Sequence, residues 1–146
     1  MFHVKETPKA IRIELSSKVD HIQNVIWETW AFLENRGYGP FLELNIVLRE
    51  LLRNAIEHGN LNIDSRRVVV TIEMAAGPLC RITVEDEGEG FAHERLGLPV
   101  EDPRHERRRG LVLIRELAER LEFNPKGNRA IVLLRPGGSD AGGNGR

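Results

Sequence analysis

Two short stretches of this chain carry residue types and spacings that could do chemistry. In the first, Glu50 and Asn54 are four residues apart, so a helix would place the carboxylate and the amide on one face. An amide oxygen is a hard neutral ligand that suits Mg²⁺, and a carboxylate one turn away could orient or deprotonate a nucleophile. An exposed helical stripe with nearby salt bridges gives the same pattern, so this pair alone is a weak signal.

The second stretch places Asp86 at the end of a predicted strand and follows it with Gly88 and Gly90. The carboxylate could accept a hydrogen bond from the exocyclic amine of adenine, and the glycines would let the backbone come close to a ligand. Aspartate and glycine are also standard turn residues, so an ordinary tight turn remains the alternative.

Two further features could bind phosphate. Arg109 and Gly110 lie where a loop is predicted to become a helix, and free backbone N–H groups at such an end attract anions. The alternative is a solvated basic run that faces the acidic residues 101–102. His58 could also contact phosphate, although a histidine just before a helix-ending glycine more often satisfies a backbone group.

The elements that must position these residues follow from hydrophobic periodicity. Alternation and β-branched content predict strands over 10–15, 67–74 and 79–86, and a closing hairpin over 122–124 and 129–135. Helical spacing predicts three helices: one capped by Ser17 and ending near Gly37, one from Pro40 to Gly59, and one that begins at Gly110.

The order of these elements predicts an α+β fold. We expect a two-layer sandwich with three helices on one face of a mixed, mostly antiparallel sheet. Residues 1–135 would form a single domain, and the Gly-rich residues 136–146 a flexible tail. Residues 91–109 show no periodicity, which is typical of a working loop or of disorder.

Composition excludes several classes of protein. The net charge is −1, which argues against a general nucleic-acid binder. Cys80 is the only cysteine, so neither an internal disulfide nor a cysteine-based zinc site can form, and it is expected to fill space in a buried strand. No apolar run is long enough to cross a bilayer, and no signal-peptide pattern is present, so we expect a cytoplasmic protein with no membrane partner.

In combination, the motifs resemble those of the Bergerat-fold ATPases, the superfamily of gyrase, Hsp90, histidine kinases and MutL. Glu50 and Asn54 resemble its N box, residues 86–91 its G1 box, and residues 109–114 its G2 box. The segment 91–109 lies where that superfamily places its ATP lid. The resemblance covers roughly residues 9 to 135 and implies the fold predicted above.

Within the superfamily, the chain is most similar to the small anti-sigma factor serine/threonine kinases of the RsbW and SpoIIAB type. The similarity lies in the length and in residues 54–59 and 122–128. It implies that the chain binds Mg-ATP and phosphorylates a serine or threonine on a STAS-domain anti-anti-sigma protein. It also implies that the chain sequesters a sigma factor and forms a homodimer, without binding nucleic acid directly.

The resemblance assigns roles to individual residues. Glu50 would be the catalytic base, Asn54 the Mg²⁺ ligand and Asp86 the reader of adenine. The residues expected to contact the nucleotide are Asn54, His58, Asp86, Gly88, Gly90, Phe91, Arg109, Gly110, Leu111 and Asn128.

This chain departs from the superfamily pattern at two places. Val112 stands where a second G2 glycine is common, and Gly127-Asn128 replaces a Gly-Thr pair, although the Asn128 amide can still donate a hydrogen bond.

The rival hypothesis is a nucleotide-responsive binding module that holds ATP, or none, and captures a partner without catalysis. The presence of Glu50 favours the kinase, because a pure binder needs no base.

Overall fold

The computed structural model describes residues 1–39, 41–91 and 106–136, with side chains in the last range described from 109 onward. The strands are β1 (Phe2–Glu6), β2 (Ala10–Ser16), β3 (Arg67–Met74), β4 (Cys80–Glu85), β5 (Arg120–Phe123) and β6 (Arg129–Leu134). The helices are α1 (His21–Glu34), α2 (Leu42–Arg53), the π-helix η1 (Asn54–Gly59) and α3 (Glu106–Leu117).

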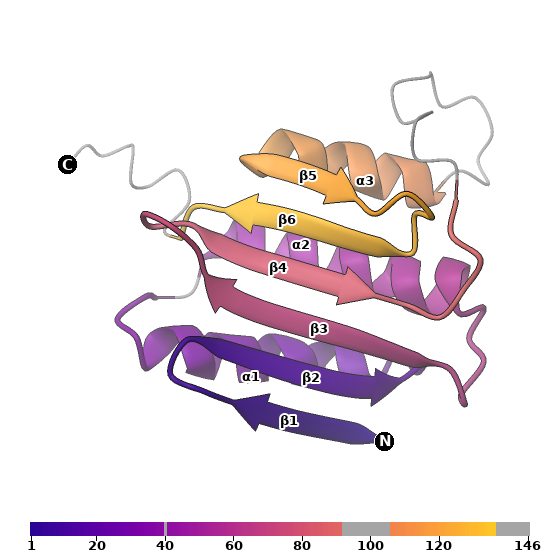
Figure 1. Ribbon diagram of the computed structural model, residues 1–146, viewed down its shortest axis with the longest axis horizontal. Coiled ribbons are helices and arrows are strands. Elements are labelled where there is room, and N and C mark those ends of the chain that lie inside the picture. Colours follow the sequence, from indigo (N-terminus) through magenta and orange to yellow (C-terminus); the bar gives the residue numbers. More distant parts are fainter. Residues whose placement is uncertain (40, 92–105, 137–146) are drawn as a thin grey trace.

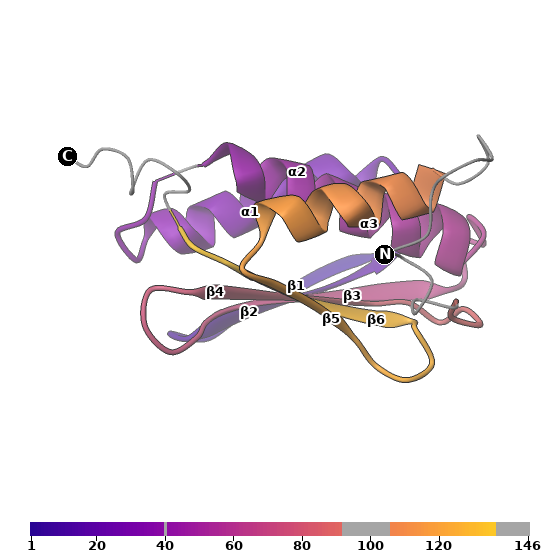
Figure 2. The ribbon, with the colours of Figure 1, turned by 90° about the horizontal axis from the view of Figure 1, so that it is seen from above.

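The described strands form one antiparallel sheet in the order β1-β2-β3-β4-β6-β5 (Figure 1). Seen from above, α1, α2 and α3 all lie on the same side of this sheet (Figure 2). The predicted α+β sandwich is therefore confirmed. The sheet is not mixed as predicted, because every pairing between the described strands is antiparallel.

The core lies between the sheet and the helices. Alternation along β2 directs Ile11, Ile13 and Leu15 inward, and each of the three is almost fully buried. From the helical layer, Phe32 and Leu48 are equally buried. This apolar layer fixes the height of the helices above the sheet, and with it the position of any site at their edge.

The Cys80 side chain belongs to the same core. It is fully buried at the start of β4, and burial raises the pKa of its thiol to about 12. A neutral, buried thiol agrees with the predicted space-filling role.

Strand β1 was not among the predicted strands. It pairs with β2 alone, at the edge of the sheet, and the residues after Phe2 are exposed. A strand with one partly buried side chain has almost no hydrophobic alternation, so its sequence carries little signal.

The first helix begins later than predicted. Its N-cap is Asp20 rather than Ser17, and no side chain caps it. The Ser17 hydroxyl instead donates to the Arg66 carbonyl oxygen at 2.7 Å, which ties the start of α1 to the residues before β3. At the other end Gly37 adopts φ +90°, and the Tyr38 N–H donates to the Leu33 carbonyl at 3.0 Å, as the predicted glycine stop requires.

The second helix changes type where the sequence predicted regular α-helix. It is α-helical to Arg53 and continues as η1, after which the Asn60 N–H donates to the carbonyl of Ala55, five residues back, at 2.8 Å. Short π-helical segments are frequent at functional sites. The predicted start at Pro40 lies outside the described residues.

The third helix begins at Glu106, four residues earlier than predicted, so Gly110 lies inside α3. The rest of the predicted lid, residues 92–105, and the predicted tail from 137 onward lie outside the described part of the chain.

Among the described helices, none has the length and apolarity needed to cross a membrane.

The two tryptophans of α1 differ. Trp30 is partly buried and its ring N–H donates to the Asn45 side-chain oxygen at 2.9 Å, which joins α1 to α2. Trp27 is 60% exposed and is not part of the core.

Candidate functional site

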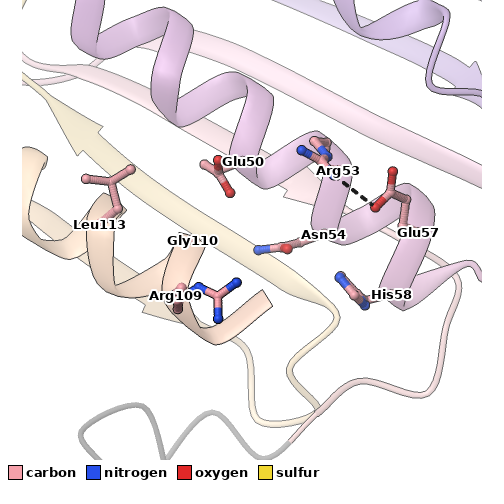
Figure 3. Close-up of a pocket in the computed structure, with 8 residues that line it drawn as sticks. All are labelled: Glu50, Arg53, Asn54, Glu57, His58, Arg109, Gly110 and Leu113. Carbon is pink, nitrogen blue, oxygen red and sulfur yellow. Dashed lines mark ion pairs between the residues drawn. The ribbon is translucent and has the colours of Figure 1, made fainter. Parts of the chain in front are cut away.

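A cavity of about 230 Å³ opens between α2, η1 and α3 (Figure 3). It is lined by Glu50, Arg53, Asn54, Glu57, His58, Arg109, Gly110 and Leu113. Five predicted site residues, from α2, η1 and α3, thus meet at one place: Glu50, Asn54, His58, Arg109 and Gly110.

The Glu50 carboxylate lies directly against the backbone of α3. A methyl group added at Gly110 would collide with Glu50 Oε1 and would stand 3.2 Å from its Cδ. The missing side chain at position 110 therefore leaves room for the Glu50 carboxylate to lie against α3 in its present position. The sequence assigned Gly110 to a helix end, whereas the structure gives it this packing role inside α3.

Asn54 is the natural candidate for a ligand contact. Its side chain is 7% exposed, faces the cavity, and its Nδ2 atom has no hydrogen-bond partner within the described part of the chain (Figure 3). A buried, unpartnered amide costs free energy unless a ligand satisfies it. Because rotation exchanges the two ends of an amide, Asn54 can offer either a donor or an oxygen ligand.

No group of three or more His, Cys, Asp or Glu side chains that could hold a metal occurs among the described residues. A metal at Asn54 would therefore take few ligands from the described part of the chain. Mg²⁺ accepts that arrangement, because it usually keeps several waters and binds substrate phosphates. Asn54 thus fits Mg²⁺ better than it would fit a metal that needs a protein cage.

A second, smaller cavity of about 20 Å³ adjoins the first and shares Asn54 with it. It is lined by Leu51, Asn54, Ala55, Val84, Asp86, Phe91, Leu111, Phe123, Gly127, Asn128 and Ala130. Four more predicted residues, Asp86, Phe91, Leu111 and Asn128, meet here. The cavity is mostly apolar with one carboxylate, which is the character of a site for a flat ring with a polar edge.

Asp86 is held tightly at this second cavity. Its side chain is 6% exposed, and its Oδ1 accepts a hydrogen bond from the Gly88 N–H at 2.7 Å. The end of η1 packs against it, since a methyl group added at Gly59 would collide with the carboxylate. Gly59 is therefore a site-shaping residue that the sequence treated only as a helix stop.

Gly88 and Gly90 line neither cavity. A methyl group at Gly88 would collide with the Gly59 carbonyl, and Gly90, at φ +85°, packs against the Lys126 backbone. These glycines therefore let the backbone pack closely against other parts of the protein. This agrees with the alternative that residues 86–90 form an ordinary tight turn.

Asn128 uses its side chain to join Asp86 to the hairpin of β5 and β6. Its Nδ2 donates to the Asp86 carbonyl at 2.8 Å, and its Oδ1 accepts from Asn124 at 2.7 Å. One of the two amide N–H groups that the sequence analysis considered for a ligand is thus engaged with the backbone of Asp86.

Three side chains of the larger cavity had no assigned role: Arg53, Glu57 and Leu113. The first two follow Glu50 at three and seven residues, the spacing of one helical face, and this spacing could have identified them. Arg53 Nη2 lies 3.6 Å from Glu57 Oε1. Leu113 comes from α3, and only the packing of α3 on α2 brings it here.

The charges of the larger cavity are balanced. Two carboxylates, Glu50 and Glu57, face two guanidinium groups, Arg53 and Arg109, beside His58 (Figure 3). The arginines come from different helices, so both walls of the cavity can offer donors to an anion.

The chain is similar in sequence to known proteins. Over 60 residues, 41% of the chain, it is 45% identical to the DNA mismatch repair protein MutL of Thermus aquaticus, and the match spans 10% of that protein. A histidine kinase domain from the blue-light activated histidine kinase of Erythrobacter litoralis EL346 is similar at a TM-score of 0.46 and 25% identity, over 67% of this chain and 44% of that chain. A TM-score this low adds nothing to the fold assignment. Residues 15–134, most of the chain, match the histidine kinase-like ATPase domain family, and the chain therefore belongs to that family.

Proposed function

We propose that this protein is an ATP-dependent serine/threonine protein kinase of the anti-sigma factor type. It phosphorylates a STAS-domain anti-anti-sigma partner and sequesters a sigma factor. The kinase thus switches between these two partners. Membership of an ATPase domain family supports the use of ATP. The resemblance of residues 54–59 and 122–128 to the anti-sigma kinases supports the finer assignment. The proposal includes that the protein is a homodimer and is located in the cytoplasm.

The two cavities suggest how ATP lies. The apolar cavity at Asp86 suits adenine, and the charged cavity at Asn54 and Arg109 suits the triphosphate. Asn54 would hold Mg²⁺, which neutralises phosphate charge when bound. A volume of about 20 Å³ has room for little more than a water. The base end must therefore widen, and Phe91, which contacts Phe123 edge-on at 5.2 Å between ring centroids, lies at its wall.

Glu50 would handle the proton during transfer. The substrate hydroxyl oxygen forms a bond to the γ-phosphorus while the bond from that phosphorus to the β,γ-bridging oxygen breaks. The hydroxyl proton passes to the Glu50 carboxylate, and ADP leaves with the electron pair of the broken bond. Most of the rate gain would come from positioning and from charge neutralisation, as is usual for phosphoryl transfer.

The observation that carries this proposal is the placement of Glu50 and Asn54 in one cavity with Arg109. A pure nucleotide binder needs the amide and the arginine but has no use for a carboxylate beside phosphate, which it would repel.

The first prediction tests these roles with radiolabelled ATP and a cognate STAS-domain protein. Glu50→Gln and Asn54→Ala should each lower phosphate transfer by at least about a hundredfold, because a catalytic base or a metal ligand is lost. The midpoint of thermal unfolding without nucleotide should change little, because Glu50 is only partly buried and Asn54 Nδ2 has no hydrogen-bond partner among the described residues.

The matched control is Glu43→Gln, in the first turn of α2 and outside both cavities, which should keep full transfer. Full transfer by purified Glu50→Gln would show that the assigned base is wrong. Binding of ATP by the wild-type chain with no transfer to any STAS-domain protein would favour the partner-capture module instead.

A further inference from the structure

Arg53 is a positively charged residue of the larger cavity to which the proposed function gives no role. It lies three residues after Glu50 and one before Asn54, so α2 places its guanidinium on the face that carries the carboxylate. All three side chains line the larger cavity (Figure 3). A permanent positive charge at such a place must act on any anion that enters.

The partner of Arg53 is Glu57, one turn further along the same face. Their closest atoms are 3.6 Å apart, and the two side chains are 51% and 27% exposed. Ion pairs at this separation and exposure contribute little to stability. The guanidinium can therefore leave Glu57 for a more strongly charged acceptor at little cost to the fold.

The arrangement of the two cavities places Arg53 at one end of a bound nucleotide. Asn54 lines both cavities, whereas Asp86 lines only the smaller one, and Arg53 and Glu57 line only the larger one. If adenine lies at Asp86, the chain of phosphates extends past Asn54 toward Arg53. Glu50, one turn away from Arg53, marks the reacting end.

We propose that Arg53 binds the terminal phosphate of ATP, exchanging Glu57 for it, and that this pair selects the triphosphate over the diphosphate. The inference rests on the proposed nucleotide site and adds a residue to it. With ADP bound, no γ-phosphate competes, and Arg53 stays with Glu57. With ATP bound, the guanidinium makes charge-assisted hydrogen bonds to the γ-phosphate, and the charge of Glu57 is left facing solvent.

The test compares dissociation constants for Mg-ATP and Mg-ADP, measured by calorimetry on the full chain. Arg53→Ala and Arg53→Gln should each weaken ATP binding about tenfold or more, which corresponds to about 1.4 kcal/mol per factor of ten. ADP binding should stay within about twofold of the wild type. Glu57→Gln should leave ADP unchanged and tighten ATP about threefold, because it removes both a competitor for Arg53 and a like charge near phosphate.

The matched control is Arg49→Ala, one turn earlier on the same helix. The Arg49 side chain is exposed, hydrogen-bonds to Gln23 and lines neither cavity, so both nucleotides should bind this variant as they bind the wild type. A purely structural role for Arg53 would weaken ATP and ADP equally, and that result overturns the inference while the nucleotide site stands. Absence of binding of both nucleotides to the wild-type chain overturns the proposed function and this inference with it.

Discussion

At the scale of single residues, Gly110 controls where the Glu50 carboxylate lies. Among the described residues, the three atoms nearest to its missing Cβ all belong to the Glu50 side chain, which is flexible and can rotate away. A glycine inside a helix costs about 1 kcal/mol relative to alanine. The chain therefore gives up some helix stability at a position that bounds the cavity.

We accordingly predict that Gly110→Ala separates stability from activity. The midpoint of thermal unfolding should stay the same or rise by a few degrees. Phosphate transfer should fall at least about tenfold, because the added methyl group displaces the Glu50 carboxylate from its position. Calorimetry or circular dichroism measures the first quantity and the labelled-ATP assay the second.

Gly39→Ala is the control, since no atom lies within 4 Å of the Cβ that it would add. It should leave transfer unchanged. Loss of stability in Gly110→Ala together with full transfer would mean that the close approach of α3 to Glu50 has no part in catalysis.

At the scale of elements, η1 is joined to its neighbours by Asn60, the residue that follows it. Asn60 is fully buried, and its Nδ2 donates at 2.9 Å both to the Ser17 hydroxyl and to the Arg67 carbonyl. Its Oδ1 accepts from the Glu87 N–H at 2.8 Å. One side chain thus holds the end of η1, the entry to α1, the start of β3 and the turn after Asp86.

This network predicts a large loss of stability for Asn60→Ala. The substitution removes one buried and two partly buried hydrogen bonds and leaves a void at a fully buried position, and we expect the free energy of unfolding to fall by about 2–4 kcal/mol. Urea denaturation measures the change. The Asp86 turn also loses its link to η1, so the dissociation constant for ATP should rise in the folded fraction.

Asn24→Ala, on the exposed side of α1, is the comparison and should change the free energy of unfolding by less than about 0.5 kcal/mol. Equal stabilities of the two variants would show that the Asn60 hydrogen bonds are replaced by water at no cost.

At the scale of the whole molecule, the edge strand β1 is fastened to the helical layer at His21. The His21 ring lies 5.3 Å from the Phe2 ring, and its Nε2 is 3.2 Å from the Ser16 hydroxyl. Its Nδ1 is buried with no hydrogen-bond partner in the described chain. Burial lowers the pKa of His21, and the charges of the amino terminus and Lys18 lower it further, against smaller opposing effects of Asp20 and Asp64.

The direction of this pKa shift predicts how stability depends on pH. The unfolded chain takes up a proton at His21 near pH 6.5, whereas the folded chain does so only at lower pH. The contribution to stability is therefore complete above about pH 6.5 and is lost as the pH falls through the folded-state pKa. In urea denaturation, His21→Gln should show a smaller loss of stability than the wild type between about pH 7 and pH 5.5.

His3→Gln, which removes an exposed histidine from β1, should lose stability over this range as the wild type does. Identical pH dependence of His21→Gln and the wild type would show that His21 takes up its proton equally well in both states.

The sequence by itself determined the hydrophobic periods. From these periods the α+β class could be predicted, and so could every described strand except β1. The sequence also proposed Glu50, Asn54 and Asp86 as candidate site residues, since helical spacing and the strand-end position are local properties. Tertiary structure alone decided which residues face a common cavity. Arg53 and Glu57 line the larger cavity with Glu50, whereas Gly88 and Gly90 line neither cavity. Asn128 lines the smaller cavity and also donates to the Asp86 carbonyl.

The physical reason is that residue pattern is a local property of the chain, whereas packing depends on segments that are far apart in the sequence. A glycine pattern looks the same whether the close approach is to a ligand or to another strand, and only packing settles which. Gly110 belongs to α3 and Glu50 to α2, and their contact exists because the core sets the distance between those helices. Local sequence supplies the chemical groups, and the packing of distant segments decides which of them meet.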